Sequence, residues 1–263
     1  MDLGLAHKVA LITGGSEGIG KASALAMAAE GAEVIICGRR IDVLNSAVEE
    51  IRRFTCADVT PIGADVTQPD QLKALFSQII NTKGRLDILV NNAGTSSATY
   101  FGNTTDAMWQ TDLDLKLFAA IRCSRMAIPH MQSVGGGRII NVTNLGGKTP
   151  GPNSTPTSVS RAAGIALTKA LSKDYAADNI LVNTVCIGSI KSGQNDRKWE
   201  KQSAQNPELT LRQWYDSLGE GVPLGRVGEA AEAGEVIAFL ASERASYITG
   251  VAINIDGGVS SVI

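Results

Sequence analysis

Seven short apolar runs alternate along the chain with longer segments of helical character. The runs, interpreted as strands, are 8–14, 33–38, 59–66, 87–92, 138–143, 180–186 and 251–256, of which 59–66 is the weakest. Helical periodicity or high alanine content marks the segments 19–30, 42–53, 69–82, 105–132, 157–177 and 229–241. Continuous apolar strands separated by helices are typical of a parallel sheet covered on both faces. The pattern therefore predicts a three-layer, doubly wound α/β fold.

Residues 191–221 interrupt this alternation with a long polar excursion. Its large apolar anchors are Trp199, Trp214 and Tyr215. A long connection after a parallel strand is usually a lid or a binding loop, although a solvated helical insertion is the alternative. We expect one dinucleotide-binding domain over 1–263 with a substrate lid at about 191–221. The lid aromatics suggest an apolar contact with substrate.

Composition excludes several classes of partner. The chain has 263 residues, of which 44% are apolar and 19% charged, as in an ordinary globular protein. A net charge of −2 gives no electrostatic reason to expect nucleic acid or an anionic membrane as a partner. No apolar run approaches the roughly 20 residues of a membrane span, and the start lacks the order of a signal peptide. We expect a cytoplasmic protein.

Cysteine and histidine give no sign of a metal site. Cys37, Cys56, Cys123 and Cys186 show no C-x-x-C spacing, which favours buried structural thiols over disulfides or reactive thiols. The two histidines, His7 and His130, are far apart and have no partners at ligand spacing. No metal is expected.

The segment "TGGSEGIG" (13–20) is the first candidate binding motif. It follows a predicted strand, precedes a predicted helix and places Gly14, Gly18 and Gly20 at the spacing G-x-x-x-G-x-G. Glycines allow a sharp turn and close approach of a ligand, while the helix start directs free N–H groups and its positive dipole end at a pyrophosphate. A plain strand-to-helix turn explains one glycine but not three. The motif predicts a dinucleotide site.

Several further motifs carry a resemblance to a known family. They are "ADV" (64–66), "NNAG" (91–94), "IINVT" (139–143), "AAGIALTKAL" (162–171), "VNTVCIG" (182–188) and "YITGVAINIDGG" (247–258). With "TGGSEGIG" in register, the chain resembles the short-chain dehydrogenase/reductase family over essentially its whole length. The resemblance implies a seven-stranded Rossmann fold that binds NAD or NADP, usually in a homodimer or homotetramer.

The resemblance also assigns cofactor positions. It implies that the glycine loop holds the pyrophosphate, 65–66 the adenine, 92–94 the adenine-side ribose and adjoining wall, and 188–190 the nicotinamide end. The full set of implied contacts is Gly14, Ser16, Glu17, Gly18, Ile19, Gly20, Arg39, Asp65, Val66, Asn92, Ala93, Gly94, Arg161, Gly188 and Ile190.

The end of the second strand decides between NADP and NAD. An acidic residue there would bind the ribose 2′-OH and repel a 2′-phosphate. Here Gly38 stands at that position and Arg39 follows, which suits a phosphate. Glu17 argues the other way, because it occupies a place in the loop where NADP-dependent members often carry a basic residue. We favour NADP(H) over NAD(H), with solvated charges at Arg39 and Arg40 as the alternative.

The reaction residues of the family are replaced in this chain. Hydride transfer to a carbonyl carbon develops negative charge on oxygen, which a donor must stabilise or protonate. The family uses a tyrosine, a lysine one helical turn later, a serine and an asparagine. In register, these positions hold Thr157, Arg161, Asn144 and Lys116. The spacing from 144 to 161 needs no gap, and we expect Thr155 to cap the helix that begins near Pro156.

Each replacement retains part of the original chemistry. Arg161 stays cationic and Asn144 can donate an amide N–H, but Thr157 is a much weaker acid than tyrosine. Lys116, near Arg161 and desolvated, is a candidate acid with a depressed pKa. The alternative is an ordinary ion pair with Asp112, four residues earlier.

Two functions remain open at this stage. One is an NAD(P)-dependent oxidoreductase for a small alcohol/carbonyl substrate; the other is a catalytically silent dinucleotide-binding protein that acts as a sensor or a partner subunit. Tyr100 and Tyr215 can reach a pocket but are as well explained by packing. Lys148 and Lys191 near the expected mouth can attract an anion or remain solvated.

Overall fold

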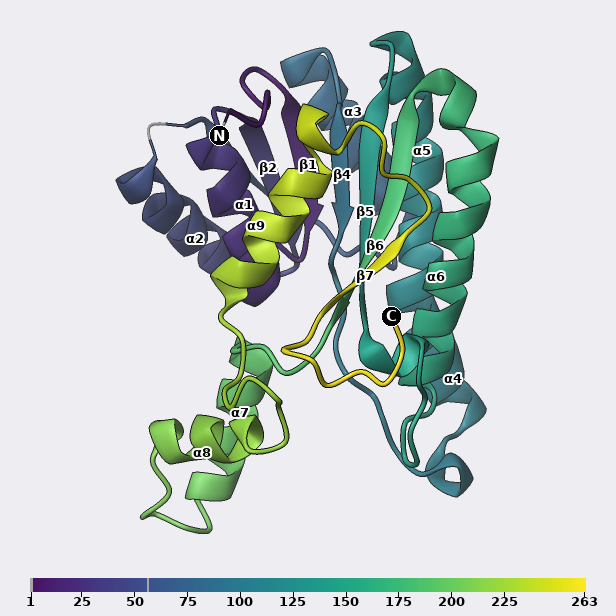
Figure 1. Cartoon of the computed structure of the whole chain (residues 1–263). Coiled ribbons are helices and arrows are strands. Elements are labelled where there is room, and N and C mark those ends of the chain that lie inside the picture. The colour runs from purple at the N-terminus through teal and green to yellow at the C-terminus, as the bar shows by residue number, and fades with distance from the viewer. Residues whose placement is uncertain (1, 56) are drawn as a thin grey trace.

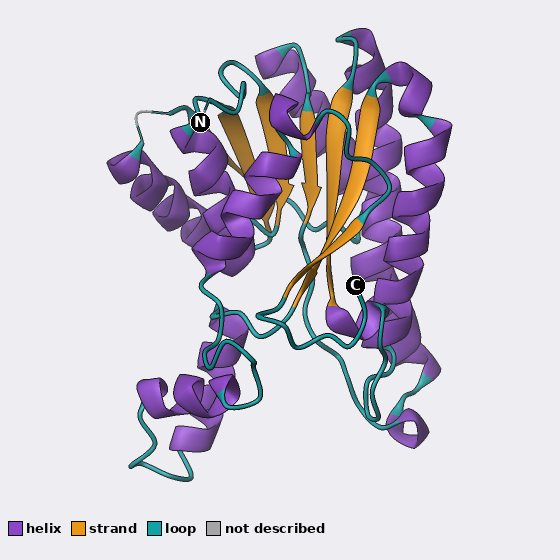
Figure 2. Ribbon diagram, in the orientation of Figure 1, coloured by secondary structure: helices purple, strands orange, loops and turns teal. Residues whose placement is uncertain are grey.

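The computed structural model describes residues 2–55 and 57–263, and these form one parallel sheet of seven strands (Figure 2). The strands are β1 (Val9–Thr13), β2 (Glu33–Gly38), β3 (Val59–Gly63), β4 (Ile88–Asn91), β5 (Gly137–Asn144), β6 (Ile180–Ile187) and β7 (Ala252–Ile255). Their order is β3-β2-β1-β4-β5-β6-β7, and every neighbouring pair is parallel. The predicted doubly wound fold is confirmed.

The helices follow the predicted segments closely, and two further helices form within the excursion 191–221. They are α1 (Gly18–Ala29), α2 (Ile41–Phe54), α3 (Pro69–Lys83), α4 (Asp106–Leu113), α5 (Ala119–Ser133), α6 (Thr157–Asp174), α7 (Gly193–Ser203), α8 (Leu211–Gly219) and α9 (Ala230–Leu240). The predicted helix 105–132 is divided by a π-helical turn, Asp114–Phe118. Such turns are often found at functional sites, and this one carries Lys116.

The helices cover both faces of the sheet (Figure 1). Ala10 and Ile12 of β1 pack with α1, α2 and α9, whereas Val9 and Leu11 pack with α3 and α5 on the other face. This alternation explains the continuous apolar run in the sequence, because both faces of the strand are buried. Each fully buried Leu or Ile side chain contributes about 1.5–3 kcal/mol to folding.

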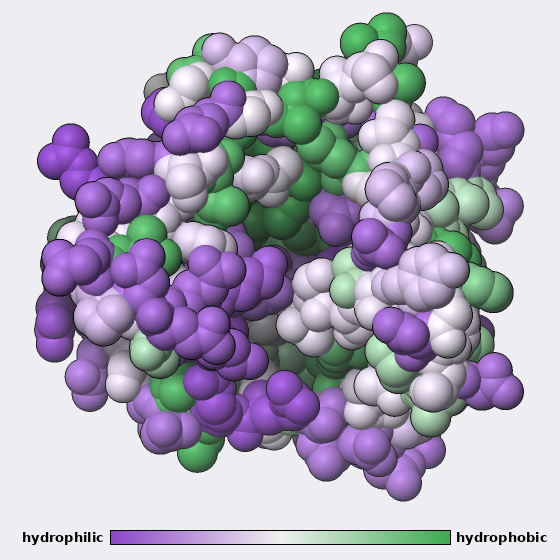
Figure 3. All heavy atoms as spheres, turned by 90° about the horizontal axis from the view of Figure 1, so that it is seen from below, coloured by the Kyte–Doolittle hydropathy of each residue, from purple (hydrophilic) through white to green (hydrophobic). Residues whose placement is uncertain are grey.

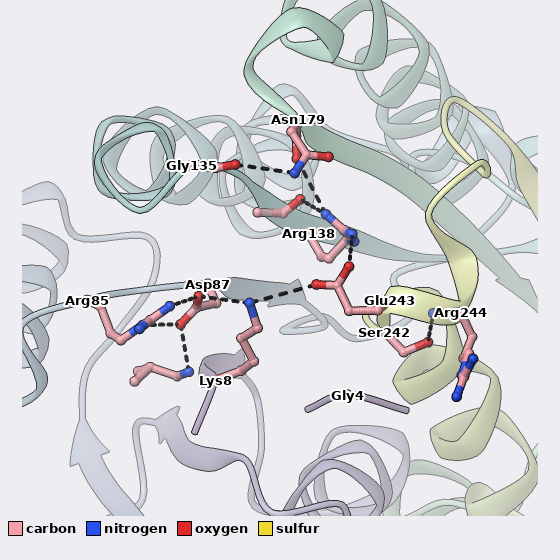
Figure 4. A network of polar contacts seen from close by, with 12 residues as sticks. Gly4, Lys8, Arg85, Asp87, Gly135, Arg138, Asn179, Ser242, Glu243 and Arg244 are labelled. Atoms are coloured by element: carbon pink, nitrogen blue, oxygen red, sulfur yellow. Dashed lines mark hydrogen bonds and ion pairs between the residues drawn. The ribbon is translucent and has the colours of Figure 1, made fainter. Parts of the chain in front are cut away.

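The amino-terminal edge of the sheet is closed by a polar network (Figure 4). The Asp87 carboxylate accepts hydrogen bonds from the Val9 amide at 2.9 Å and from Arg85 Nε at 2.8 Å. Arg138 donates to the Gly137 carbonyl at 3.0 Å, and its Nη2 lies 3.5 Å from Glu243 Oε2. These contacts join the beginnings of β1, β4 and β5 to the turn before β7. The opposite, carboxyl-terminal edge of the sheet is the one that is free to form a site.

The carboxyl-terminal edge is open and hollowed. The strand order reverses between β1 and β4, where a crevice for a ligand is expected in such sheets. The excursion between β6 and α9 folds into α7 and α8 beside this edge (Figure 1). Seen from this end, the surface is hollow at its centre, with apolar residues at the floor and hydrophilic residues around the rim (Figure 3).

Candidate functional site

A cavity of about 440 Å³ lies at the carboxyl ends of the strands. It is lined by every residue that the sequence assigned to the dinucleotide except Gly20. The lining further includes Gly38, Arg40, Ala64, Thr95, Leu115, Val142, Ile187, Ser192, Gly193, Gln194, Asn195 and Arg197. Segments that are remote in the sequence therefore line one cavity, and this cavity lies where an extended ligand can bind.

The glycine loop forms the floor of this cavity. Gly14 and Gly18 have φ angles of 64° and 54°, in the left-handed region that favours glycine. Helix α1 begins at Gly18, and its N-cap residue Glu17 makes no side-chain cap. The first N–H groups of the helix are consequently free to bind an anion, helped by the helix dipole. This backbone fits a pyrophosphate.

Gly20 has a packing role and lies outside the cavity lining. A Cβ atom there would lie 2.3 Å from the Gly14 carbonyl oxygen and 2.5 Å from Asn92 Nδ2. Its absence lets the helix approach the turn closely, and the implied cofactor contact of Gly20 stays a prediction. Thr13, which the sequence reasoning missed, accepts hydrogen bonds from the Asn92 and Ala93 amides, each at 3.0 Å. It ties β1 to β4 across the reversal of strand order.

Glu17 is neutralised at the corner where β2 ends. Its Oε2 lies 2.9 Å from Arg40 Nη2 and 3.4 Å from Arg197 Nη1. Arg39 also lines the cavity here. The acidic side chain that argued against a phosphate is thus paired with two guanidinium groups, one of them on α7, which the sequence did not reveal.

The excursion 191–221 contacts the cavity through the start of α7. Gln194 accepts a hydrogen bond from the Ser96 amide at 3.2 Å and donates to the Gly94 carbonyl at 3.3 Å. Two of the aromatic residues that the lid interpretation names form hydrogen bonds inside the excursion. Trp199 Nε1 donates to the Leu209 carbonyl at 2.8 Å, and the Tyr215 hydroxyl donates to Asp196 at 2.6 Å.

Burial and the bond to Asp196 raise the pKa of Tyr215 to about 12. Trp199, Trp214 and Tyr215 do not line the 440 Å³ cavity, but Tyr215 lines a second cavity of about 420 Å³ that Ser192 and Gly193 also line, so the apolar contact with substrate stays a prediction. Tyr100 is 63% exposed and lies outside the cavity lining as well.

The two lysines expected at the mouth are engaged elsewhere. Lys148 Nζ donates to the Ala252 carbonyl and to Asn254 Oδ1, both at 2.6 Å, and so anchors β7. Lys191 pairs with Glu229. Neither lysine lines the cavity, and their attraction of an anion stays a prediction.

Three of the four predicted reaction residues gather at the start of α6. Lys116 Nζ donates to Thr157 Oγ1 at 3.0 Å and forms an ion pair with Asp112. The Asp112 carboxylate also accepts a hydrogen bond from Ser160 at 2.6 Å. The ion pair with Asp112 is therefore present, and it places the ammonium group against Thr157, whereas the role of Lys116 as an acid stays a prediction. Ser160 was missed, since one serine among several on a helix carries no signal.

Arg161 connects this cluster to the cavity. Its Nη1 donates to the Val142 carbonyl at 2.7 Å, and its Nη2 would meet a Cβ at Gly94 at 2.9 Å. Arg161 lines the large cavity and also a smaller one of about 20 Å³ that Lys116 and Ser160 line as well. Lys116, Thr157 and Asn144 do not line the large cavity.

Burial sets the proton affinity of this cluster. Desolvation, reinforced by the positive charge of Arg161, lowers the pKa of Lys116 to about 8 against the opposing effect of Asp112. Desolvation likewise lowers the pKa of Arg161 to about 10. Thr157 is only 4% exposed, and its hydroxyl oxygen also accepts the Ser97 amide at 2.9 Å. The predicted depressed pKa of Lys116 thus has a geometric basis.

The surroundings of Asn144 and the helix start differ from expectation. The buried Oδ1 of Asn144 has no partner among the described residues. Thr155 does not cap α6; Pro156 is the N-cap, and Thr155 Oγ1 instead donates to the Thr99 carbonyl at 3.3 Å. The predicted cap is wrong because this hydroxyl joins two loops.

Thiols and metal ligands add nothing to the site. Cys37, Cys123 and Cys186 are buried and free, as expected, and burial raises the pKa of each thiol. Cys56 lies outside the described residues. Across 2–55 and 57–263, no three His, Cys, Asp or Glu side chains are grouped to hold a metal ion. Within the same part of the chain, no helix has the length and apolarity to cross a membrane.

Comparisons with known proteins agree with this geometry. The family model described as enoyl-(acyl carrier protein) reductase matches residues 14–260. The chain is 35% identical over 255 residues to the 3-oxoacyl-acyl-carrier-protein reductase FabG of Thermotoga maritima, covering 97% of this chain and 98% of the relative.

Solved structures give the same result. L-sorbose reductase from Gluconobacter frateurii, complexed with NADPH and L-sorbose, superposes with a TM-score of 0.95 at 32% identity over 100% of both chains. A short chain oxidoreductase from Pseudomonas aeruginosa PAO1 that contains an atypical catalytic center superposes with a TM-score of 0.92 at 34% identity, over 99% of this chain and 100% of the other. Its NADPH-bound form gives a TM-score of 0.90. Fold, cavity and relatives together establish that the chain belongs to the short-chain dehydrogenase/reductase family, whose members are NAD(P)-dependent oxidoreductases.

Proposed function

We propose that the protein is an NADP(H)-dependent oxidoreductase that interconverts a small alcohol and its carbonyl compound with an unusual set of reaction residues. The observation that carries the proposal is the buried lysine, Lys116, held 3.0 Å from Thr157 behind the cavity-lining Arg161. A lysine of pKa about 8 is a usable acid near neutral pH, which threonine alone is not.

The chain's own residues divide the work at the substrate oxygen. A bound nicotinamide supplies or accepts the hydride. Arg161, at the cavity wall, stabilises negative charge that develops on the substrate oxygen. Thr157 gives its hydroxyl proton to that oxygen and receives one from Lys116. Because Ser97 covers Thr157, this transfer requires the segment 95–97 to move aside.

The amide of Asn144 is the fourth member of the proposed set, as a donor that orients the substrate oxygen. The excursion 191–221 acts as the lid, since residues 192–195 at the start of α7 already line the cavity. We place the substrate between this lid and Arg161.

The preference for NADP(H) is supported at the end of β2. Gly38 leaves room and Arg39 lines the cavity, while Arg40 neutralises Glu17 at 2.9 Å. A guanidinium group binds phosphate bidentately, whereas the carboxylate that would select a free 2′-OH is missing. The L-sorbose reductase and the Pseudomonas aeruginosa oxidoreductase were both solved with NADPH.

A homodimer or homotetramer is the proposed assembly. Phe118 and Val159, which are 39% and 46% exposed, lie next to α5 and on α6, the helices expected to pair across a two-fold axis.

A catalytically silent dinucleotide-binding protein is the second candidate. It is favoured by the burial of Thr157, whose hydroxyl is already bonded to Ser97 and Lys116, and by the neutralisation of Lys116 by Asp112. In that case the cluster only stabilises the start of α6.

Lys116→Met separates the two candidates. We expect NADPH binding, followed by fluorescence, to be unchanged, while turnover across a panel of carbonyl compounds and alcohols falls by about 100-fold, the loss typical of a missing acid. Lys173→Met, on the exposed face of α6, is the matched control and leaves turnover unchanged. Binding without turnover in the unmodified protein, with turnover gained by Thr157→Tyr and Arg161→Lys together, would establish the silent candidate instead.

A further inference from the structure

We infer that Arg197, carried by the lid helix α7, is a cofactor-specificity residue that binds the 2′-phosphate of NADP(H) together with Arg39 and Arg40. Glu17 holds Arg40 and Arg197 in place at this corner. The inference deepens the proposed function and rests on its preference for NADP(H).

Four charged side chains meet at the corner where β2 ends. Arg39, Arg40, Arg197 and Glu17 all line the large cavity, next to Gly38. The three guanidinium groups outnumber the carboxylates of Glu17 and of Asp65, which lines the same cavity, so the corner keeps a positive charge after Glu17 is paired. A phosphate monoester carries about −1.5 to −2 charges at pH 7 and complements this excess. A free ribose hydroxyl brings no such charge.

The pairing of Arg197 leaves donors available. Only its Nη1 contacts Glu17, at 3.4 Å, which is longer than a strong charge-assisted bond. Within the part of the chain that the structure describes, its other guanidinium N–H groups have no hydrogen-bond acceptor. A guanidinium group has five donors in a planar fork, so Arg197 can keep Glu17 and accept a phosphate oxygen as well.

An isolated surface ion pair is the simpler explanation, because Arg197 and Glu17 are 51% and 38% exposed and such pairs contribute little. The position of Arg197 at the cavity indicates a role beyond a surface ion pair. Arg197 lines the cavity from the lid, whereas Arg212 on α8 pairs with Asp216 at 3.7 Å, is 92% exposed and lies outside the lining. The lid thus carries one arginine at the ligand space and one remote from it.

The same contact couples the cofactor to the lid. Gln194 already joins the start of α7 to residues 94–96 on one rim of the cavity. Arg197 joins the helix to a second part of the rim, the glycine loop at Glu17. A 2′-phosphate adds a ligand-mediated bond at this second part, so NADP(H) holds the lid more firmly than NAD(H) does.

Affinities of NADPH and NADH for Arg197→Gln test the inference without requiring turnover. We expect the Kd of NADPH to rise about fivefold, as for one partly exposed charge pair, while the Kd of NADH stays within about twofold. Arg212→Gln, with the same charge change on the same lid, leaves both values unchanged. The difference in the Kd of NADPH between the unmodified protein and Arg197→Gln should shrink as the salt concentration rises, because screening weakens exposed charge pairs.

The Glu17→Gln background distinguishes direct phosphate binding from neutralisation of Glu17. If Arg197 binds the phosphate, Arg197→Gln still weakens NADPH about fivefold when Glu17 is already uncharged. If adding Arg197→Gln to Glu17→Gln leaves the ratio of NADPH affinity to NADH affinity unchanged, the inference is overturned while the proposed preference for NADP(H) stands. Equal affinity of the unmodified protein for NADPH and NADH overturns both.

Discussion

The two halves of the cavity are built from different material. In the dinucleotide half, the turn after β1 holds Gly14 and Gly18 in left-handed conformations, and the charged side chains at the end of β2 are partly exposed. Around the reaction half, at the π-helical turn and the start of α6, the walls are backed by buried side chains that carry charge. One half depends on the absence of side chains and the other on their mutual neutralisation.

Because of this difference, we expect the two halves to tolerate different kinds of substitution. A glycine turn is disturbed by any Cβ but is indifferent to charge, whereas a buried ion pair tolerates replacement of both partners better than loss of one. The following variants test whether the halves respond in these distinct ways.

The largest effect is expected from Asp112→Asn. Asp112 is 1% exposed and neutralises Lys116, so its loss leaves a buried ammonium group without its counter-charge. Unfolding by urea should show a loss of about 3–5 kcal/mol. Asp114→Asn, at a half-buried carboxylate two residues later, should cost less than about 1 kcal/mol.

The double variant Asp112→Asn with Lys116→Met sharpens this test. Removing both charges should recover most of the stability, because the desolvation cost disappears with them. Equal losses in Asp112→Asn and Asp114→Asn would mean that the reaction half does not depend on charge neutralisation.

A smaller effect is expected from Gly20→Ala. The added Cβ would lie 2.3 Å from the Gly14 carbonyl oxygen, so the turn must shift. Overpacking of this kind costs about 1–3 kcal/mol, and we expect NADPH affinity to fall about tenfold or more. Gly151→Ala is the control, since a Cβ there meets nothing within 4 Å. Undiminished NADPH affinity in Gly20→Ala would show that close packing of α1 does not shape the loop.

The smallest effect is a pH dependence in the reaction half. Only protonated Lys116 can donate, and its pKa is about 8, so carbonyl reduction should fall about tenfold between pH 7 and pH 9. Arg161, with a pKa of about 10, remains charged over this range. The residual activity of Lys116→Met should lack this fall. If it shows the same fall, another group is the acid.

Much of the dinucleotide half could be predicted from the sequence. The spacing of Gly14, Gly18 and Gly20 between a strand and a helix determines a local turn, and local geometry depends on nearby residues alone. Arg39 at the end of β2 followed from the same local pattern. Even here, the contribution of Arg197 to the corner was hidden, because it depends on where the lid folds.

The sequence predicted which residues form the reaction half but not how they contact one another. The spacing of Thr157 and Arg161 placed them one helical turn apart, and Lys116 was recognised as a candidate acid. The π-helical turn, the bond of Ser160 to Asp112 and the covering of Thr157 by Ser97 were beyond reach. The contacts that hold Lys148 and the lid aromatic residues were also missed, because they too join residues that are distant in the sequence.

The sequence by itself determined the order of strands and helices, the doubly wound architecture and the glycine turn, because apolar periodicity and glycine spacing act over a few neighbouring residues. Only the tertiary structure decided which charges are buried, which are paired and which side chains reach the cavity. Desolvation and ion pairing depend on atoms brought together from distant segments, such as Glu17 with Arg197 and Lys116 with Thr157.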